Sequence, residues 1–235
     1  MKKGKIFLIP TTLGDSELDR VLPGFNLDLI NNIKYYIVEN VRTARRFLVK
    51  SEIKTKIDDL QFFELNKHTD IEEYSTFLKP ALSGFDIGII SEAGCPGVAD
   101  PGADIVKIAH EIDIDVIPLV GPSSILLALM ASGMNGQNFA FKGYLPVDNI
   151  KKLKQLKNDE LRSRKEAQTQ IYIETPYRNM QLLKFMIDNL APTTKLCVAA
   201  DITLETEYIK TKSIEEWSKK TPDFNKRPTI FLVYA

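Results

Sequence analysis

The chain has 235 residues, of which 44% are hydrophobic and 26% are charged, the composition of an ordinary globular protein. Collagen-like, disordered and disulfide-stapled proteins are therefore excluded. A chain of this length buries roughly 70–75% of its unfolded surface, so one large or two modest domains can form without metals or cross-links. The two cysteines, Cys95 and Cys197, lie in no CxxC pair, which favours a reducing compartment, and with only two histidines we expect no structural zinc.

The charge is balanced overall but not along the chain. The 31 basic residues match the 31 acidic ones, so the net charge gives no global attraction to nucleic acid or to membranes. Residues 1–118 carry 14 basic and 19 acidic residues, which leaves 17 basic and 12 acidic residues for 119–235. Much of this excess lies between Lys142 and Lys165. That segment is either a solvated helix face or a surface that holds an anionic substrate.

Neither apolar stretch of the sequence predicts a membrane or secretion signal. Pro10 ends the first stretch after four residues, too early for a signal peptide, so we predict a first β-strand there. The second, Ile112–Met134, is interrupted by Asp113, Asp115, Pro118, Gly121 and Pro122, so it is not a spanning helix. We therefore expect a cytoplasmic protein that does not contact a membrane.

The first half alternates short apolar runs with amphipathic segments of helix length, the pattern of a mostly parallel sheet covered by helices. The predicted strands are Lys5–Pro10, Lys34–Val38, Gln61–Glu64, Asp86–Ile90 and Asp115–Leu119, and the predicted helices are Val41–Lys50, Asp70–Ser83 and Gly102–Glu111. We expect a five-stranded α/β domain over residues 1–119.

The second half predicts a mixed sheet. The predicted strands are Phe139–Gly143, Gln170–Glu174, Leu196–Ala200, Glu205–Lys210 and Thr229–Tyr234, and the predicted helices are Ser123–Ala131, Asn149–Glu166 and Arg178–Asn189. The third and fourth of these strands are too close in sequence for a crossover helix, so they must pair antiparallel. We expect a second α/β domain over residues 120–235, joined to the first at 119–122 and sharing a cleft with it.

Three loops follow predicted strands of the first domain, where open α/β sheets bind ligands. The loop 10–15 matches neither G-x-G-x-x-G nor a P-loop. The loop Ser91–Gly102 has twelve residues, whereas such connections usually take about 2–6. Asp100 as N-cap and Pro101 at the first helical position explain only its end. Glu92 is either a ribose ligand or a solvated carboxylate.

The third loop, Val120–Ser124, opens the apolar helix. Ser123 either caps that helix or contacts a ligand with its hydroxyl. Nucleophilic catalysis is disfavoured, because Ser123 lacks a G-x-S-x-G elbow and neither histidine lies in a recognisable triad context. Cys95 has no evident base, so we interpret it as inert packing.

Five segments in collinear order resemble the tetrapyrrole methylase superfamily, the class III S-adenosylmethionine-dependent methyltransferases. They are Glu39–Arg42 (ENVR), Ser91–Gly102 (SEAGCPGVADPG), Gly121–Ser124 (GPSS), Ser132–Pro146 (SGMNGQNFAFKGYLP) and Glu174–Arg178 (ETPYR). The most similar branch methylates a ribose 2′-hydroxyl of small-subunit ribosomal RNA. The acid of its E-D-T-R motif is Asn40 here and the histidine of its E-S-P-H-R motif is Tyr177, and its C-terminal extension is expected to be missing after Ala235.

The resemblance implies a two-domain methyltransferase with the cofactor in the cleft between the domains. The cofactor is S-adenosyl-L-methionine, the product is S-adenosyl-L-homocysteine, and no metal is needed because the methyl group is already activated. The implied cofactor-binding residues are Pro10, Ser91, Glu92, Cys95, Ser123 and Ser124, with Tyr172, Ile173, Ala200 and Pro228 from the second domain.

Roles in acceptor binding and proton transfer are also implied. Glu39, Glu174 or Tyr177 would accept or relay the proton of a ribose hydroxyl. Arg42 and Arg178 would clamp substrate phosphates, extended by the basic segment 151–165, although surface ion pairing explains both arginines equally well. The resemblance further implies a homodimer.

The sequence leaves the methyl acceptor open. The leading hypothesis is ribosomal RNA of the small subunit, supported by motif order and the basic second half. Alternatives are a tetrapyrrole or other small molecule, a protein side chain, and a non-catalytic module that binds S-adenosylmethionine. Asn40 and Tyr177 keep the last alternative open.

Overall fold

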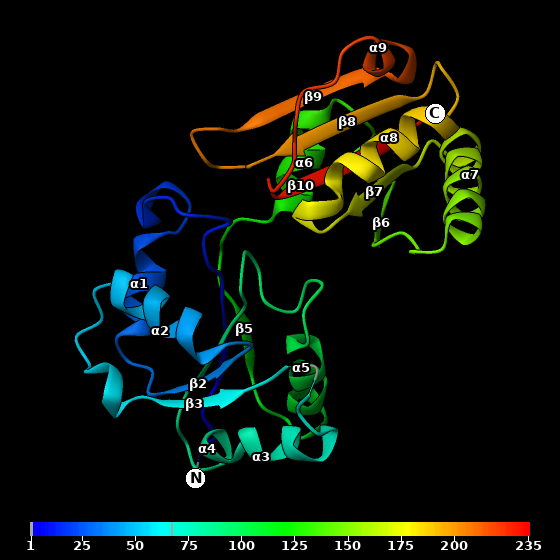
Figure 1. The fold of residues 1–235 in the computed structure, drawn as a ribbon. Coiled ribbons are helices and arrows are strands. Elements are labelled where there is room, and N and C mark those ends of the chain that lie inside the picture. The colour runs from blue at the N-terminus through cyan, green and yellow to red at the C-terminus, as the bar shows by residue number, and fades with distance from the viewer. Residues whose placement is uncertain (1, 67) are drawn as a thin grey trace. The chain divides into compact units, whose positions relative to one another are not determined.

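The computed structural model describes residues 2–66 and 68–235. Backbone contacts divide the chain into two units, Met1–Ser123 and Ser124–Ala235, and each is described by itself (Figure 1). Across the described residues, no helix is both long and apolar enough to cross a membrane.

The first unit is built on a five-stranded parallel sheet with the order β3-β2-β4-β1-β5. Its strands are β1 (Ile6–Ile9), β2 (Tyr35–Val38), β3 (Gln61–Glu64), β4 (Ile87–Ile90) and β5 (Val116–Pro118). All five strands were predicted within one or two residues. Since the strands are parallel, their carboxyl ends lie at one edge of the sheet, which the loops from β1, β4 and β5 share.

Helices cover both faces of this sheet. They are α1 (Gly24–Ile30), α2 (Val41–Lys50), α3 (Tyr74–Phe77), α4 (Lys79–Leu82) and α5 (Gly102–Glu111), with 3₁₀ turns η1 (Leu18–Arg20), η2 (Ile57–Asp59) and η3 (Ile71–Glu73). Ile6 and Ile87 pack toward α3–α5, whereas Phe7 and Ile9 pack toward α1 and α2. The alternation of side chains along each strand thus gives one core on each face.

One helix prediction in this unit was wrong, and one helix was not predicted. The predicted helix Asp70–Ser83 is broken into η3, α3 and α4, because Pro80 lacks an N–H and its ring clashes with the preceding turn, so a new helix starts around it. Helix α1 was missed because it is short and starts at Gly24, a weak helix former. Tertiary contact stabilises it: Asn26 Nδ2 donates to the Val120 carbonyl at 2.8 Å.

The second unit is built on a five-stranded mixed sheet, as predicted, and its strand order is β6-β7-β10-β8-β9. Its strands are β6 (Phe139–Gly143), β7 (Thr169–Ile173), β8 (Lys195–Ala200), β9 (Tyr208–Ser213) and β10 (Thr229–Tyr234). Only β6 and β7 pair parallel. The predicted antiparallel pairing of β8 with β9 is confirmed, but β9 starts three residues later, because residues 201–207 form a turn with positive φ at Asp201 and Thr203.

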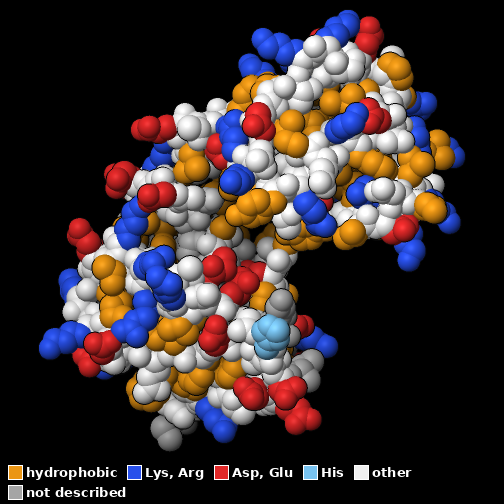
Figure 2. Space-filling view, viewed as in Figure 1, with side chains coloured by type: hydrophobic (Ala, Val, Ile, Leu, Met, Phe, Trp, Pro, Cys, Tyr) orange, Lys and Arg blue, Asp and Glu red, His pale blue; other side chains and the backbone are white. Residues whose placement is uncertain are grey.

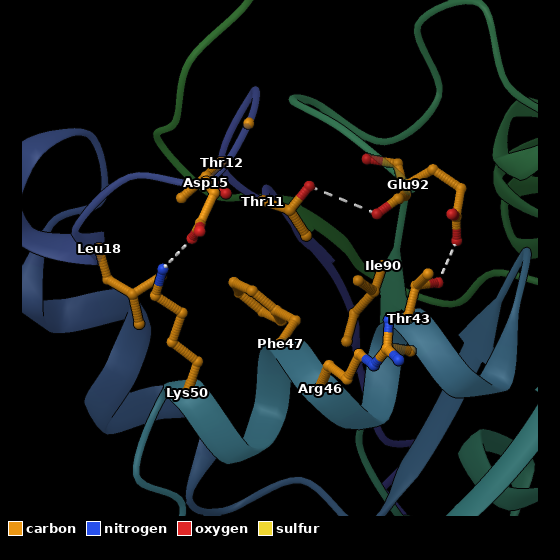
Figure 3. Close-up of a pocket in the computed structure, with 13 residues that line it drawn as sticks. Thr11, Thr12, Asp15, Leu18, Thr43, Arg46, Phe47, Lys50, Ile90 and Glu92 are labelled. Atoms are coloured by element: carbon orange, nitrogen blue, oxygen red, sulfur yellow. Dashed lines mark hydrogen bonds and ion pairs between the residues drawn. The ribbon is translucent and has the colours of Figure 1, made fainter. Parts of the chain in front are cut away.

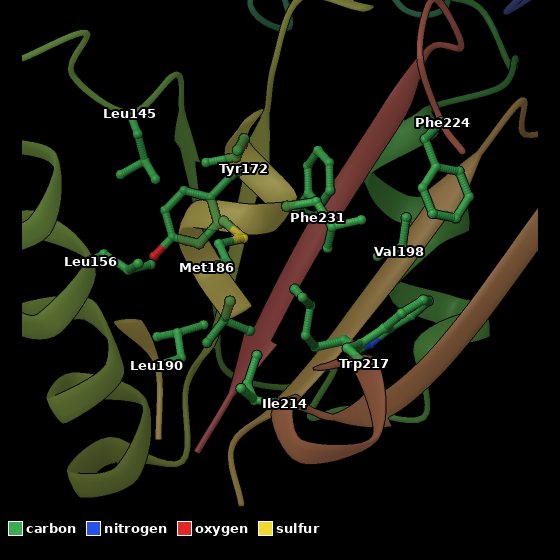
Figure 4. Packing of buried hydrophobic residues seen from close by; sticks show 14 of the residues in the cluster. Leu145, Leu156, Tyr172, Met186, Leu190, Val198, Ile214, Trp217, Phe224 and Phe231 are labelled. Atoms are coloured by element: carbon green, nitrogen blue, oxygen red, sulfur yellow. The ribbon is translucent and has the colours of Figure 1, made fainter. Parts of the chain in front are cut away.

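The helices of this unit are α6 (Ser124–Ser132), α7 (Asn149–Glu166), α8 (Asn179–Asn189) and α9 (Ile214–Lys219), with the 3₁₀ turn η4 (Pro176–Arg178). Helix α9 was missed, although Ser213 and Glu216 form a capping box, which the spacing S-x-x-E in the sequence predicts. The core packs Trp217, Phe224 and Phe231 with Met186 against the sheet (Figure 4). Tyr172 lies in the same core, and its hydroxyl donates to Asp159 Oδ2 at 3.0 Å.

Candidate functional site

The three predicted ligand-binding loops meet at the carboxyl edge of the first sheet. The Thr11 N–H donates to the Gly94 carbonyl at 2.9 Å, and the Cys95 thiol donates to the Pro122 carbonyl at 3.3 Å. A Cβ on Gly121 would lie only 2.2 Å from Pro10 Cγ. The loop after β1 therefore packs directly against the loops after β4 and β5.

Hydrogen bonds between side chains and the backbone hold the Ser91–Gly102 loop in one shape. Ser91 Oγ donates to the Gly94 carbonyl at 3.0 Å, and Asp100 Oδ1 accepts from the N–H groups of Gly97 and Gly102, both at 2.8 Å. The expected capping needs one correction, because Pro101, not Asp100, is the N-cap of α5. Because Asp100 accepts from one N–H within the loop and from one at the first residue of α5, its carboxylate connects the loop to the helix.

Carboxylates gather where β2 and β4 end. Burial raises the pKa of Glu39 above its usual value, and the nearby charges of Asp100 and Glu92 raise it further, while a hydrogen bond from the Glu92 backbone N–H lowers it. Burial also raises the pKa of Asp100, opposed by its two backbone hydrogen bonds. Because ionised Glu39 is disfavoured there, this side chain is a suitable proton acceptor that also holds the Glu92 backbone.

We expect Glu39→Gln to stabilise the protein at neutral pH. A raised folded-state pKa means that the Glu39 carboxyl favours folding when it is protonated, and this contribution is lost as the pH rises through that pKa. Glutamine keeps the acceptor for the Glu92 N–H and removes the charge. The melting temperature of the variant should exceed that of the wild type at pH 7.5, and the difference should disappear at acidic pH. A variant less stable at both pH values would contradict this account.

Asn40, which stands where the family motif carries an aspartate, is the residue directly before helix α2. Its Oδ1 accepts from the N–H groups of Arg42 at 2.9 Å and Thr43 at 3.3 Å, so it is the N-cap. One helical turn on, Thr43 Oγ1 donates to Glu92 Oε1 at 2.5 Å. The predicted residue Arg42 is exposed at the start of the same helix.

A pocket of about 370 Å³ lies between α2 and the loops after β1 and β4 (Figure 3). Its lining combines apolar side chains, hydroxyls and charges: Thr11, Thr12, Gly14, Asp15, Leu18, Thr43, Ala44, Arg46, Phe47, Lys50, Ile90, Ser91 and Glu92. The Phe47 ring projects from α2 into its middle. Lys50 Nζ binds Asp15 Oδ1 and the Ser16 carbonyl, both at 2.9 Å, and so fixes the β1 loop at one end.

The predicted cofactor residues of the second unit end neighbouring strands. Ile173 ends β7 and Ala200 ends β8, and both strands pair with the start of β10, where Pro228 immediately precedes the strand. The Asp201 N–H donates to the Pro228 carbonyl at 2.9 Å. These three residues therefore share one edge of the sheet. Tyr172 is fully buried in the core, so its side chain supports this edge.

The ETPYR segment of the second unit, Glu174–Arg178, forms hydrogen bonds between its own residues. Glu174 Oε1 accepts from Arg178 Nε at 3.0 Å, Arg178 Nη2 at 2.6 Å and the Thr175 N–H at 2.7 Å. The Glu174 side chain is 6% exposed, so the Arg178 guanidinium compensates a buried charge. Tyr177 between them is 75% exposed. Glu174 and Arg178 thus have a clear structural role, whereas the Tyr177 phenol faces solvent.

Nucleophilic and metal chemistry have little support in the described part of the chain. Burial raises the pKa of the Cys95 thiol, which disfavours the thiolate that a nucleophile needs. No group of three or more metal-ligating side chains occurs among residues 2–66 and 68–235. Sequence reasoning missed the pocket residues Thr43, Arg46 and Phe47. Their signal was available, because they form the first turns of a helix that directly follows a strand end.

Comparison with known proteins shows which solved structures share this fold. No family model matches the sequence. Among solved structures, the methyltransferase CobJ matches with a TM-score of 0.63 and 16% identity, over 98% of this chain and 94% of that chain. Uroporphyrin-III C-methyl transferase from Thermus thermophilus, solved with S-adenyl homocysteine, matches with a TM-score of 0.57 and 15% identity, over 98% and 97%. The two sheets therefore form the fold of the tetrapyrrole methylases.

Sequence comparison is more specific. The ribosomal RNA small subunit methyltransferase I of Bacillus subtilis is 32% identical over 213 residues, 91% of this chain and 68% of that protein. That of Vibrio cholerae is 28% identical over 233 residues, 98% of this chain and 77% of that protein. Fold and motifs define a class III S-adenosylmethionine-dependent methyltransferase. Within that class, the chain belongs to the ribosomal RNA small subunit methyltransferase I family.

Proposed function

We propose that this enzyme transfers a methyl group to a ribose 2′-hydroxyl of small-subunit ribosomal RNA. One observation carries the proposal: the segments that resemble the family's motifs in the first unit meet at one sheet edge, where the loops after β1, β4 and β5 are hydrogen-bonded together. The relatives from B. subtilis and V. cholerae are named as methyltransferases of small-subunit ribosomal RNA. The acceptor atom is assigned from the resemblance.

The residues at this edge fit S-adenosylmethionine. Gly94 has a φ of 74°, and a Cβ there would lie 3.0 Å from the Pro122 carbonyl oxygen, so only glycine leaves the loop backbone this close. Backbone groups and the hydroxyl of Ser91 suit the polar groups of an adenosyl ligand. We assign Pro10, Ser91, Glu92, Cys95, Ser123 and Ser124 to the cofactor, with Ile173, Ala200 and Pro228 as assignments in the second unit.

When bound, the cofactor supplies an electrophilic methyl group. The chain's own residues then have to orient the acceptor hydroxyl, exclude water and accept its proton. Glu39 is the preferred proton acceptor of the first unit, because its raised pKa marks a carboxylate that binds a proton readily. Glu174 is a weaker candidate, because its Oε1 already accepts three hydrogen bonds.

Helix α7 supplies a basic surface for RNA. Figure 2 shows Lys and Arg side chains along the α7 side of the second unit. Some of them are occupied within the protein: Lys157 lies 3.5 Å from Glu160, Arg162 lies 3.5 Å from Glu166, and Lys152 lies over the Phe185 ring. Lys151, Lys154, Arg164 and Lys165 are exposed and are the residues that we assign to RNA phosphates.

Methyl transfer from labelled S-adenosylmethionine tests the proposal. The purified protein is incubated with small ribosomal subunits that lack the modification, with total protein and with a tetrapyrrole as separate acceptors. We expect label in the ribosomal RNA, in a nucleotide whose ribose resists alkaline cleavage at its 3′ phosphate. Label only in protein or tetrapyrrole would transfer the assignment to that acceptor, and no label in any arm would favour a non-catalytic binding module. Light scattering tests the expected homodimer.

Arg178→Ala separates the structural role of this arginine from the predicted phosphate clamp. The substitution leaves the buried Glu174 carboxylate without its cation, so we expect the free energy of unfolding to fall by about 2 kcal/mol. If Arg178 also clamps RNA, the KM for RNA rises while the Kd for S-adenosylmethionine is unchanged. Equal losses of RNA and cofactor affinity would contradict the clamp, and denaturant titration would show whether both follow from lost stability.

A further inference from the structure

The pocket between α2 and the β1 and β4 loops borders the residues assigned to the cofactor but extends away from them along the helix. Ser91 and Glu92 form the shared wall, and the rest of the lining comes from the β1 loop and from residues 43–50 of α2. We infer that this pocket receives the single nucleotide that accepts the methyl group, extruded from the RNA. This inference rests on the proposed function and names the site of its substrate.

The lining matches the three parts of a nucleotide. Leu18, Phe47 and Ile90 give the pocket an apolar side, and the Phe47 ring projects into its middle, as a base requires for stacking (Figure 3). The hydroxyls of Thr11 and Thr12 and the Glu92 carboxylate suit ribose hydroxyls. A volume of about 370 Å³ is in the range of small-molecule sites, and enzymes that do chemistry on a base bind the extruded nucleotide in a fitted pocket.

Arg46 is the group that we assign to the phosphate. It is exposed at the rim, and Figure 3 shows its guanidinium turned toward Ile90 and Thr43. The neighbouring cations are occupied: Arg45 is paired with Asp58, and Lys50 with Asp15. Among the pocket's cations, and within the described residues, only Arg46 has no hydrogen bond or ion pair to another side chain. An unpaired guanidinium beside hydroxyls and an aromatic ring suits a phosphate diester.

Thr43 positions the shared wall. Its Oγ1 donates to Glu92 Oε1 at 2.5 Å and also lies 3.0 Å from the Asn40 carbonyl oxygen. Both contacts are within the protein, so we assign this hydroxyl to holding Glu92 and not to binding the nucleotide. The Glu92 carboxylate is thereby held at the boundary between the pocket and the cofactor residues. A ribose bound against this wall would have its hydroxyls next to the cofactor side, which is what methyl transfer between two bound partners needs.

The test compares Arg46→Ala and Phe47→Leu with Arg45→Ala. Arg45 lies on the same helix, but its exposed ion pair with Asp58 does not line the pocket, so it is the matched control for charge. We expect Arg46→Ala to raise the KM for RNA about tenfold and to leave the Kd for S-adenosylmethionine within about twofold. Arg45→Ala should change both by less than about twofold. Phe47→Leu should also raise the KM for RNA, and thermal unfolding is measured to check that this variant is folded.

A second measurement reads binding without turnover. Cytidine and uridine 5′-monophosphates are titrated into ¹⁵N-labelled protein with S-adenosylhomocysteine present, and the amide signals of Gly14, Thr43 and Phe47 should shift for wild type and Arg45→Ala but not for Arg46→Ala. Unchanged kinetics in Arg46→Ala, or nucleotide shifts outside the pocket, would overturn the inference. A loss of cofactor affinity in Arg46→Ala would assign the pocket to the cofactor instead. If wild type labels no RNA, the proposed function fails, and the titration still decides the pocket's ligand.

Discussion

Replacing Gly121 with alanine is expected to abolish most of the cofactor affinity. The added Cβ would lie 2.2 Å from Pro10 Cγ and 2.3 Å from Pro10 Cβ, both atoms of a rigid ring, so the loops after β1 and β5 must move apart. We expect the Kd for S-adenosylmethionine to rise at least about 100-fold, because displacing backbone by about 1 Å is enough to disrupt a positioned site. Overpacking should also lower the free energy of unfolding by about 3 kcal/mol.

Gly136→Ala is the matched control for this substitution. A Cβ on Gly136 meets nothing within 4 Å, so the same chemical change should leave both the Kd and the stability nearly unaffected. Calorimetric titration with S-adenosylmethionine and S-adenosylhomocysteine, after removal of carried-over ligand, measures both variants. A folded Gly121→Ala protein with wild-type affinity would show that this loop contact does not shape the cofactor site.

Replacing Trp217 with alanine is expected to give the largest loss of stability in the second unit. Its ring is fully buried among the core residues, its Nε1 donates to the Leu196 carbonyl at 2.8 Å, and Lys212 Nζ lies 4.9 Å from the ring centroid (Figure 4). A truncation of this size leaves a cavity and an unpaired carbonyl, at a cost of about 4 kcal/mol. Chemical denaturation followed by circular dichroism measures it.

Trp217→Phe separates packing from hydrogen bonding in the same core. Phenylalanine retains most of the apolar surface but leaves the Leu196 carbonyl without its donor, so the expected loss is about 2 kcal/mol. A larger loss for phenylalanine than for alanine would contradict the packing account. Strand β8 carries both Leu196 and the predicted cofactor residue Ala200. Unfolding of this unit therefore also removes Ala200 from its place, so Trp217→Ala should reduce methyl transfer in proportion to the unfolded fraction.

The sequence was sufficient for the sheets because their strands are marked by short apolar runs between turn signals. It was insufficient wherever tertiary contact decides the local structure. Helix α1 depends on the hydrogen bond from Asn26 to a carbonyl 94 residues away, which no local pattern contains. The break of the predicted helix 70–83 was readable from Pro80, and α9 from its capping box, so these two errors came from signals that were present.

The candidate site was predictable to a similar extent. The positions of the strand-end loops follow from the parallel topology, so Pro10, Ser91 and Cys95 could be placed at one edge from sequence alone. The ion pair that occupies Arg178 and the role of Asn40 as a helix cap depend on side-chain geometry, which the motifs do not encode. The pocket along α2 was missed although part of its signal was available, because Thr43, Arg46 and Phe47 lie on a helix that directly follows the end of β2. The rest of its lining comes from two other segments, which no local pattern joins to that helix.

The central claim, that the edge formed by the loops after β1, β4 and β5 binds the cofactor, is tested most directly by a crystal structure of this protein with S-adenosylhomocysteine. The account predicts the ligand in contact with Pro10, Ser91, Cys95 and the Gly121–Ser124 segment, with the pocket beside Phe47 left to the acceptor. Ligand density in the α2 pocket, or at a position that touches none of these loops, would contradict it.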